Sequence, residues 1–170
     1  MRVFSHNRGM TLLEVVVSIG ILSLLGVSML AMLTHSLRGW ASGAGNEAAG
    51  STASTALSRL TYDIREARSA IVSGNQLIVT FPKVLTDPNT NERIYDSTLN
   101  DPIPRYYYVT GGNLVCNAGG TTSILRRGVS SATFVPAANS VEVTLVCTQQ
   151  LGTSVCTQQA TGRVTFRNYQ

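Results

Sequence analysis

The chain has 170 residues, which suits one domain with an appendage because domains cluster near about 100–150 residues. The formal net charge is +4. Only 13% of the residues are charged, and Ser, Thr, Gly and Asn are abundant, which suits an exported or surface domain better than a cytosolic enzyme. The basic residues are scattered, with Arg126–Arg127 the one adjacent pair, whereas a nucleic-acid groove carries a dense basic stripe, so dedicated nucleic-acid binding is disfavoured.

Residues 1–9 form a short leader that contains two arginines and no apolar core. A secretory signal peptide has its apolar stretch before the cleavage site, and here the apolar stretch comes after Gly9. Cleavage at Gly9 would therefore leave the apolar stretch on the mature protein. This leader is not an ordinary secretory signal.

Residues 10–37 are long and apolar enough to cross a bilayer, since about 20 apolar residues span one. The leader arginines favour a cytoplasmic N-terminus, which would leave residues 38–170 facing outward. One carboxylate, Glu14, lies inside this run. A charged side chain within a membrane span suggests a functional role and is expected to have a partner of opposite charge. The alternative is that Glu14 only reaches the nearby interface.

Residues 38–55 are rich in small residues and contain four glycines, each of which weakens a helix by about 1 kcal/mol relative to alanine. Either the helix continues weakly here or it breaks into a flexible stalk. A helical period then returns, with apolar residues at alternating steps of three and four. It predicts an amphipathic helix over 54–69, laid across a sheet. The apolar stripe is Ala53, Leu57, Leu60, Ile64, Ala67 and Ile71.

From residue 71 onward the pattern is typical of strands. We expect a hairpin over 71–81, a polar excursion over 82–104, a second hairpin around Gly111–Gly112, and further strands up to the C-terminus. The predicted fold class is α+β. A long N-terminal helix, with a transmembrane first half and an amphipathic second half, packs on an antiparallel β-sheet head.

The sequence contains no set of residues that is typical of a catalytic site. Neither His6 nor His35 has a carboxylate or cysteine at ligand spacing, and no glycine-rich phosphate loop precedes a helix. We therefore predict no enzyme activity, no cofactor and no metal. One string, residues 87–98, begins like a calcium loop but lacks its glycine and closing glutamate. A turn-rich loop is expected, and the calcium alternative would use Asp87, Asn89, Asn91 and Asp96.

Three cysteines leave one thiol over if a disulfide forms, and an exported head permits one. Cys147 and Cys156 close a short loop and are the best-placed pair. Pairing of Cys116 with Cys147 is the second option.

The run Tyr106–Tyr108 offers an aromatic platform for a carbohydrate or a receptor. Alternate side chains of a strand point to opposite faces, so we expect at least one of these tyrosines to lie in the core.

The sequence RGMTLLEVVVSIGILSLL resembles the processing site of type IV pilins and type II secretion pseudopilins. The resemblance implies that a prepilin peptidase cuts after Gly9 and methylates the new N-terminus on Met10. Thr11 and Glu14 would then serve subunit assembly. Met10 stands where major subunits usually carry phenylalanine, and the span lacks their usual proline, which implies a minor subunit.

More loosely, the segments LTYDIREARSAIVSGNQLIVTF and YYYVTGGNLVC resemble J-type pseudopilins and PilW-type minor pilins. This resemblance implies a non-enzymatic filament subunit that is held in the inner membrane before assembly. The implied partners are other pilins or pseudopilins, the prepilin peptidase, the assembly platform, and a secreted protein or DNA at the head. The alternative is a DNA-uptake pilus subunit that contacts phosphates through Arg126, Arg127, Arg163 and Arg167.

Overall fold

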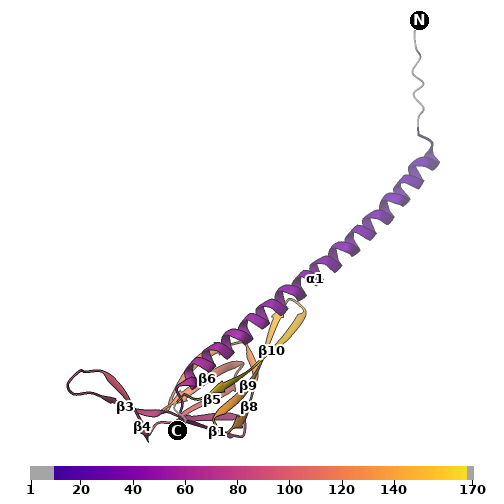
Figure 1. The fold of residues 1–170 in the computed structure, drawn as a ribbon. Helices are drawn as coiled ribbons and strands as arrows, with labels where there is room; N and C mark the ends of the chain where they lie inside the picture. Colours follow the sequence, from indigo (N-terminus) through magenta and orange to yellow (C-terminus); the bar gives the residue numbers. More distant parts are fainter. Residues whose placement is uncertain (1–9, 168–170) are drawn as a thin grey trace. The chain divides into compact units, whose positions relative to one another are not determined.

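The computed structural model describes residues 10–167 and divides the chain into two compact units, one up to residue 41 and one from residue 42. One helix, α1 (Leu12–Arg65), has residues in both units (Figure 1). The glycine-rich stretch is therefore helical, and of the two expectations for residues 38–55 the continuous helix is confirmed. The helix ends at Arg65, four residues before the predicted end.

Within the second unit, which we call the head, one stripe of α1 is buried. It consists of Gly45, Ala49, Ala53, Ala56, Leu60 and Ile64. The predicted apolar period is thus confirmed. The buried stripe also extends further towards the N-terminus, to Ala49 and Gly45, whose small side chains give no hydrophobic pattern in the sequence. Of the other predicted members, Leu57 is partly buried, and Ala67 is buried but lies beyond the end of the helix. The last predicted member was wrong, because Ile71 lies in a strand and is 61% exposed.

Five strands form one antiparallel sheet in the order β1-β2-β5-β6-β7. The first two are the predicted hairpin, β1 (Ser69–Ser73) and β2 (Gln76–Thr80). The others are β5 (Arg105–Thr110), β6 (Asn113–Ala118) and β7 (Thr121–Arg127). The hairpin predicted around Gly111–Gly112 is the β5–β6 turn, where both glycines have positive φ.

A second sheet has the order β10-β9-β8, with β8 (Val129–Ala137), β9 (Ser140–Leu151) and β10 (Ser154–Thr165). The C-terminal hairpin is long, with 12 residues in each strand, and β10 begins directly after a turn at Gly152, whose φ is +60°. Side chains from α1 and from both sheets form one hydrophobic core. The predicted α+β fold is confirmed.

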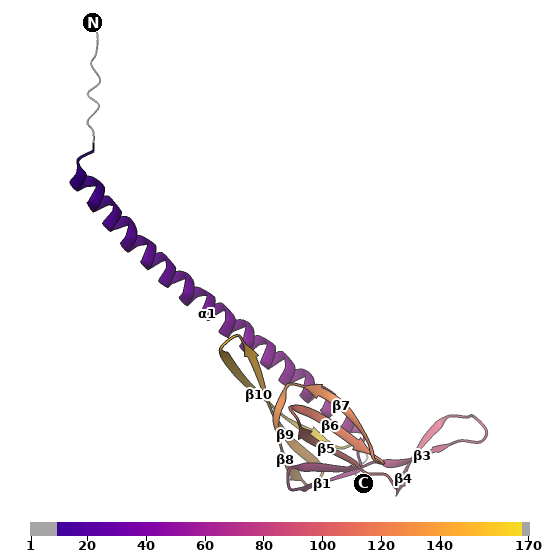
Figure 2. The ribbon, with the colours of Figure 1, turned by 180° about the vertical axis from the view of Figure 1, so that it is seen from behind.

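The segment 82–104, predicted as a polar excursion, contains a two-stranded sheet of β3 (Pro82–Thr86) and β4 (Arg93–Asn100). Figures 1 and 2 show this hairpin extending away from the other strands of the head. Near the end of the segment, the Asp101 N–H donates at 2.8 Å to the carbonyl of Phe81, the residue between β2 and β3.

Candidate functional site

Thr11 and Glu14 form a reciprocal capping box at the start of α1. The backbone N–H and the hydroxyl of Thr11 donate to Glu14 Oε2 at 2.9 and 3.1 Å, and the Glu14 N–H donates to Thr11 Oγ1 at 3.3 Å. A helix start leaves backbone N–H groups without partners, and a Thr-x-x-Glu sequence satisfies two of them. The structure thus brings together two predicted site residues as a helix cap. The T-L-L-E spacing indicates this role, which was not among the predictions from the sequence.

The two residues predicted for processing, Gly9 and Met10, precede this cap in the sequence. Met10 precedes Thr11 and is 71% exposed, and it lines a shallow hollow with Leu13, Glu14, Val17 and Ser18. Gly9 and the rest of the leader lie outside the described residues, so cleavage there stays a prediction. The carboxylate of Glu14 also suits this position because negative charge is favourable at a helix N-terminus.

The N-terminal part of α1 is apolar on all sides, and by length and composition this helix can cross a membrane. Three serines of this segment bond to its own backbone. The hydroxyls of Ser18, Ser23 and Ser28 each donate to the carbonyl four residues earlier at 2.7 Å. A hydroxyl satisfied inside its own helix needs no partner from lipid or from a neighbouring protein.

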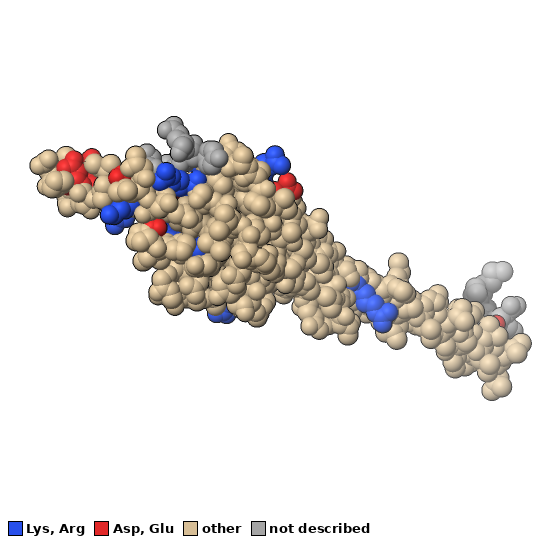
Figure 3. Space-filling model, turned by 90° about the horizontal axis from the view of Figure 1, so that it is seen from below, with Lys and Arg blue, Asp and Glu red and all other residues tan. Residues whose placement is uncertain are grey.

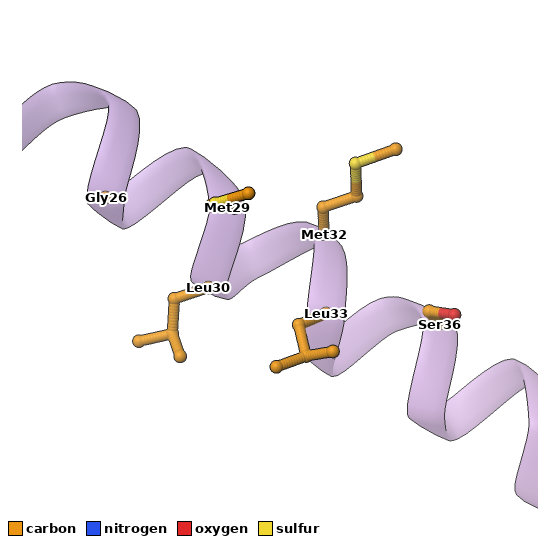
Figure 4. A pocket seen from close by; sticks show the side chains of 6 residues that line it. All are labelled: Gly26, Met29, Leu30, Met32, Leu33 and Ser36. Carbon is orange, nitrogen blue, oxygen red and sulfur yellow. The ribbon is translucent and has the colours of Figure 1, made fainter.

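Gly26 lies in a shallow notch on the surface of this helix, lined also by Met29, Leu30, Met32, Leu33 and Ser36. No atom lies within 4 Å of the position that a Cβ would take at Gly26. Figure 4 shows Leu30 and Leu33 projecting on the same side of the helix. A glycine between large apolar residues lets a neighbouring helix approach closely.

In the head, the middle residue of the tyrosine run is core. Tyr107 is fully buried, whereas Tyr106 and Tyr108 are half-buried. Tyr107 lies beside Cys116, its partner across β5 and β6, and burial raises the pKa of both side chains. The expectation that one tyrosine is core is confirmed, and these residues do not form an open platform.

The three cysteines are buried free thiols in this structure. The strand register places Cys147 opposite Gln158 and Cys156 opposite Gln149, so the two candidates for a disulfide are two residues out of register. The turn at Gly152 sets this register. Cys156 Sγ lies 3.5 Å from the Ser42 carbonyl of α1 and donates to it.

The four arginines considered for DNA divide into two pairs. Arg126 and Arg127 lie on β7, whereas Arg163 and Arg167 face carboxylates, with Arg163 3.4 Å from Glu142 and Arg167 3.3 Å from Glu66. In Figure 3 the basic side chains are dispersed over the face shown. This arrangement offers no continuous basic track there.

The calcium-like string forms the turn of the β3–β4 hairpin and continues into β4. Asp87 Oδ1 accepts from the Asn89 N–H at 2.8 Å, and the Asp87 carbonyl accepts from the Asn91 N–H at 2.9 Å. Asp96 Oδ1 is held by the backbone N–H and hydroxyl of Thr98. Within residues 10–167, no group of three or more His, Cys, Asp or Glu side chains is placed to hold a metal ion.

Comparison with known proteins gives one match. Residues 4–30 match the family model described as the prokaryotic N-terminal methylation motif. The match covers the capping box and most of the apolar segment and leaves the head unmatched. No curated protein and no solved structure matches the chain.

Proposed function

From the prokaryotic N-terminal methylation motif that the chain carries over residues 4–30, we infer a non-enzymatic filament subunit, either a minor pilin or a pseudopilin. A prepilin peptidase cleaves after Gly9 and methylates Met10. The mature chain then enters a type IV pilus or a type II secretion pseudopilus. The observation that carries this proposal is the motif itself, together with the position of the Thr11–Glu14 cap directly behind the cleavage site.

Glu14 supplies the assembly contact. After cleavage the free amino group of Met10 stands one residue before the cap, so each subunit presents a cation and a carboxylate at the same end. In lipid or in a helix stack a carboxylate needs a counter-charge. The amino terminus of a neighbouring subunit provides one. Thr11 orients the carboxylate by holding Oε2 through two hydrogen bonds.

The apolar surface of α1 allows the subunit to lie first in the membrane and then in the filament. Before assembly it anchors the chain in the inner membrane with the N-terminus in the cytoplasm, and afterwards it packs against the helices of other subunits. The notch at Gly26 supports close helix packing. The assembly platform of the inner membrane extracts the subunit. The head contacts other minor subunits or the transported partner.

The topology of the head supports the finer likeness to J-type pseudopilins and PilW-type minor pilins. The LTYDIR segment ends the helix, and the next residues form the β1–β2 hairpin. The YYYVTGGNLVC segment forms the β5–β6 hairpin.

Mass spectrometry of the protein purified from membranes tests the processing step. We expect an N-terminus at Met10 that carries one methyl group. A chain that still begins at Met1 in assembled filaments contradicts the proposal. Expression without a prepilin peptidase is the control, and there the leader should remain.

A DNA-uptake pilus subunit is the alternative, and the structure gives it less support because Arg163 and Arg167 already face carboxylates. A gel shift of duplex DNA with the full chain in detergent separates the two functions. We expect no shift at low salt. A shift that weakens steeply as salt rises would favour the DNA-binding subunit.

A further inference from the structure

A cleft of about 470 Å³ lies between the end of α1 and the β3–β4 hairpin. Small-molecule sites occupy about 300–1,000 Å³, so this cleft has the size of one. Aromatic, charged and apolar groups line it together: Tyr62, Asp63, Glu66, Phe81, Pro82, Val84, Arg93, Tyr95, Asp101 and Arg105. None of these residues belongs to the N-terminal segment that carries the methylation motif.

The floor of the cleft is held in place by defined contacts. The Arg105 guanidinium lies 4.2 Å from the centre of the Phe81 ring. Asp101 donates its N–H to the Phe81 carbonyl at 2.8 Å, and its Oδ1 accepts from the Ile103 N–H at 3.0 Å. The strand register also shifts between Pro82 and Lys83, and such irregularities re-aim side chains beside functional sites. A pre-arranged floor lowers the entropy lost when a ligand binds.

Several walls of the cleft keep unused hydrogen-bonding capacity. Within residues 10–167, the side chains of Asp63 and Arg93 form no hydrogen bond and no ion pair within 4 Å. Arg105 and Arg59, whose charges act on Asp63, form their direct contacts with other groups, since Arg105 lies over Phe81 and Arg59 donates to the Leu125 carbonyl at 3.0 Å. A carboxylate and a guanidinium are therefore both available to a ligand.

Two tyrosines give the cleft open aromatic surface. Tyr62 is 80% exposed and Tyr95 is 55% exposed, and they come from different elements, α1 and β4. Tyr62 also lines two neighbouring hollows on the head, so its ring is accessible from more than one side. These rings are platforms on which the apolar face of a ligand can stack.

The charges of the lining limit the ligand class. Three carboxylates and two guanidiniums line the cleft, and Arg167 faces Glu66, so the local charge is close to balanced. A polyanion would meet the carboxylates, and a hydrocarbon would bury charged walls at a cost. A neutral molecule with several hydroxyls and apolar C–H faces uses both the planar charged groups and the rings.

We propose that this cleft binds a neutral oligosaccharide, which stacks on Tyr62 and Tyr95 and takes hydrogen bonds from Arg93 and to Asp63. The inference goes beyond the filament role and does not depend on it, because the cleft lies wholly in the head. The tyrosines that it uses differ from Tyr106–Tyr108, which the sequence offered as a platform for a carbohydrate or a receptor.

The test uses the full chain in detergent micelles whose headgroup is not a sugar. Fluorescently labelled protein is applied to an array of neutral and acidic oligosaccharides, and binders are titrated by calorimetry. Lactose and 3′-sialyllactose form a matched pair that differs in one anionic sugar. We expect binding to neutral members of the array. Failure of every neutral oligosaccharide at about 10 mM, or binding of acidic ones alone, overturns the proposal.

Variants then locate the site. Tyr62→Ala should weaken binding at least about tenfold, since about 1.4 kcal/mol of lost contact corresponds to that factor. Tyr62→Phe keeps the ring and should retain most of the affinity. Ile71→Ala, at an exposed position of β1 outside the cleft, is the matched control and should bind as the parent chain does. Binding that Tyr62→Ala leaves unchanged contradicts this assignment of the site.

Discussion

A Cβ atom built on Gly45 would lie 2.6 Å from Sγ of Cys156 and 3.2 Å from its Cβ. Real Cβ atoms essentially never approach another heavy atom so closely, so α1 meets β10 here at a distance that only glycine permits. The same position would stand 3.3 Å from Cδ1 of Leu151. Gly45 is therefore required by packing, although glycine is a poor helix former.

Gly45→Ala should destabilise the head. Alanine gains about 1 kcal/mol of helix propensity, but overpacking a filled site costs about 1–3 kcal/mol, and we expect the overpacking to prevail. Gly43→Ala is the matched control, because nothing lies within 4 Å of its Cβ position, and it should stabilise the helix. Thermal unfolding of the full chain in detergent measures both. The double variant Gly45→Ala/Cys156→Ala should recover part of the loss, and equal loss in single and double variants would contradict the contact.

The thiols should be unreactive in the folded protein. Cys116, Cys147 and Cys156 are buried, and burial raises the pKa of the first two, which lowers their reactive thiolate fraction at neutral pH. Alkylation at pH 7.5 followed by mass spectrometry should show slow labelling before denaturation and three labels after it. Uptake of two of these labels only after addition of a reductant would reveal a disulfide and contradict the free thiols.

Glu14→Gln should abolish incorporation into filaments while leaving processing unchanged. Glutamine keeps the size and the hydrogen-bonding oxygen that the cap uses, but it cannot neutralise the amino terminus of a neighbour. The measurement is the amount of the chain in sheared filaments against membranes, detected by immunoblot. Glu47→Gln, at an exposed carboxylate on the same helix, should assemble normally. Normal assembly of Glu14→Gln would leave the charge pairing without support.

Asp63→Asn should stabilise the head at pH 7 and not at about pH 3. Burial raises the pKa of Asp63 above 3.8, although Arg105 and Arg59 act in the opposite direction. Between the two pKa values the folded state holds more protons than the unfolded state, so stability falls as pH rises through that window. The cost of the charged carboxylate is complete at neutral pH and disappears below the window, where Asp63 is protonated in both states.

Unfolding midpoints of the parent chain and of Asp63→Asn at the two pH values check this prediction. Glu47→Gln should change stability by less than about 0.5 kcal/mol at both. If Asp63→Asn is also the variant that binds oligosaccharide more weakly, the carboxylate is retained for binding at the expense of stability. A stability gain that is larger at the acidic pH would show that the sign of the pKa shift is wrong.

The helical period was readable because Ala53, Leu60 and Ile64 alternate at steps that only a helix places on one face. The extension of the buried stripe to Gly45 and Ala49 could not be predicted. Small residues carry no hydrophobic signal, and their burial depends on how closely β10 approaches α1. Local propensity disfavoured a helix there, and packing overrode it.

The sequence does not predict the β3–β4 hairpin, because four prolines and many polar residues bound and interrupt 82–104. Yet the pairs Val84–Tyr95 and Leu85–Ile94 of its ladder are apolar and were present in the sequence. The cleft itself could not be predicted, since it needs Tyr62 from the helix and Tyr95 from this hairpin. The cysteine register was likewise set by one turn, at Gly152, that sequence spacing does not specify.

Three serines of the apolar segment affect what assembly costs in hydrogen bonds. Ser18, Ser23 and Ser28 keep their hydroxyl protons on carbonyls of their own helix. When the proposed subunit passes from bilayer to filament, these groups have no hydrogen bond to break on one side and none to form on the other. The transfer then changes the surface contacts of the helix and the surroundings of Glu14, but not the hydrogen bonds of these three serines. The three hydroxyls therefore favour neither the bilayer nor the filament.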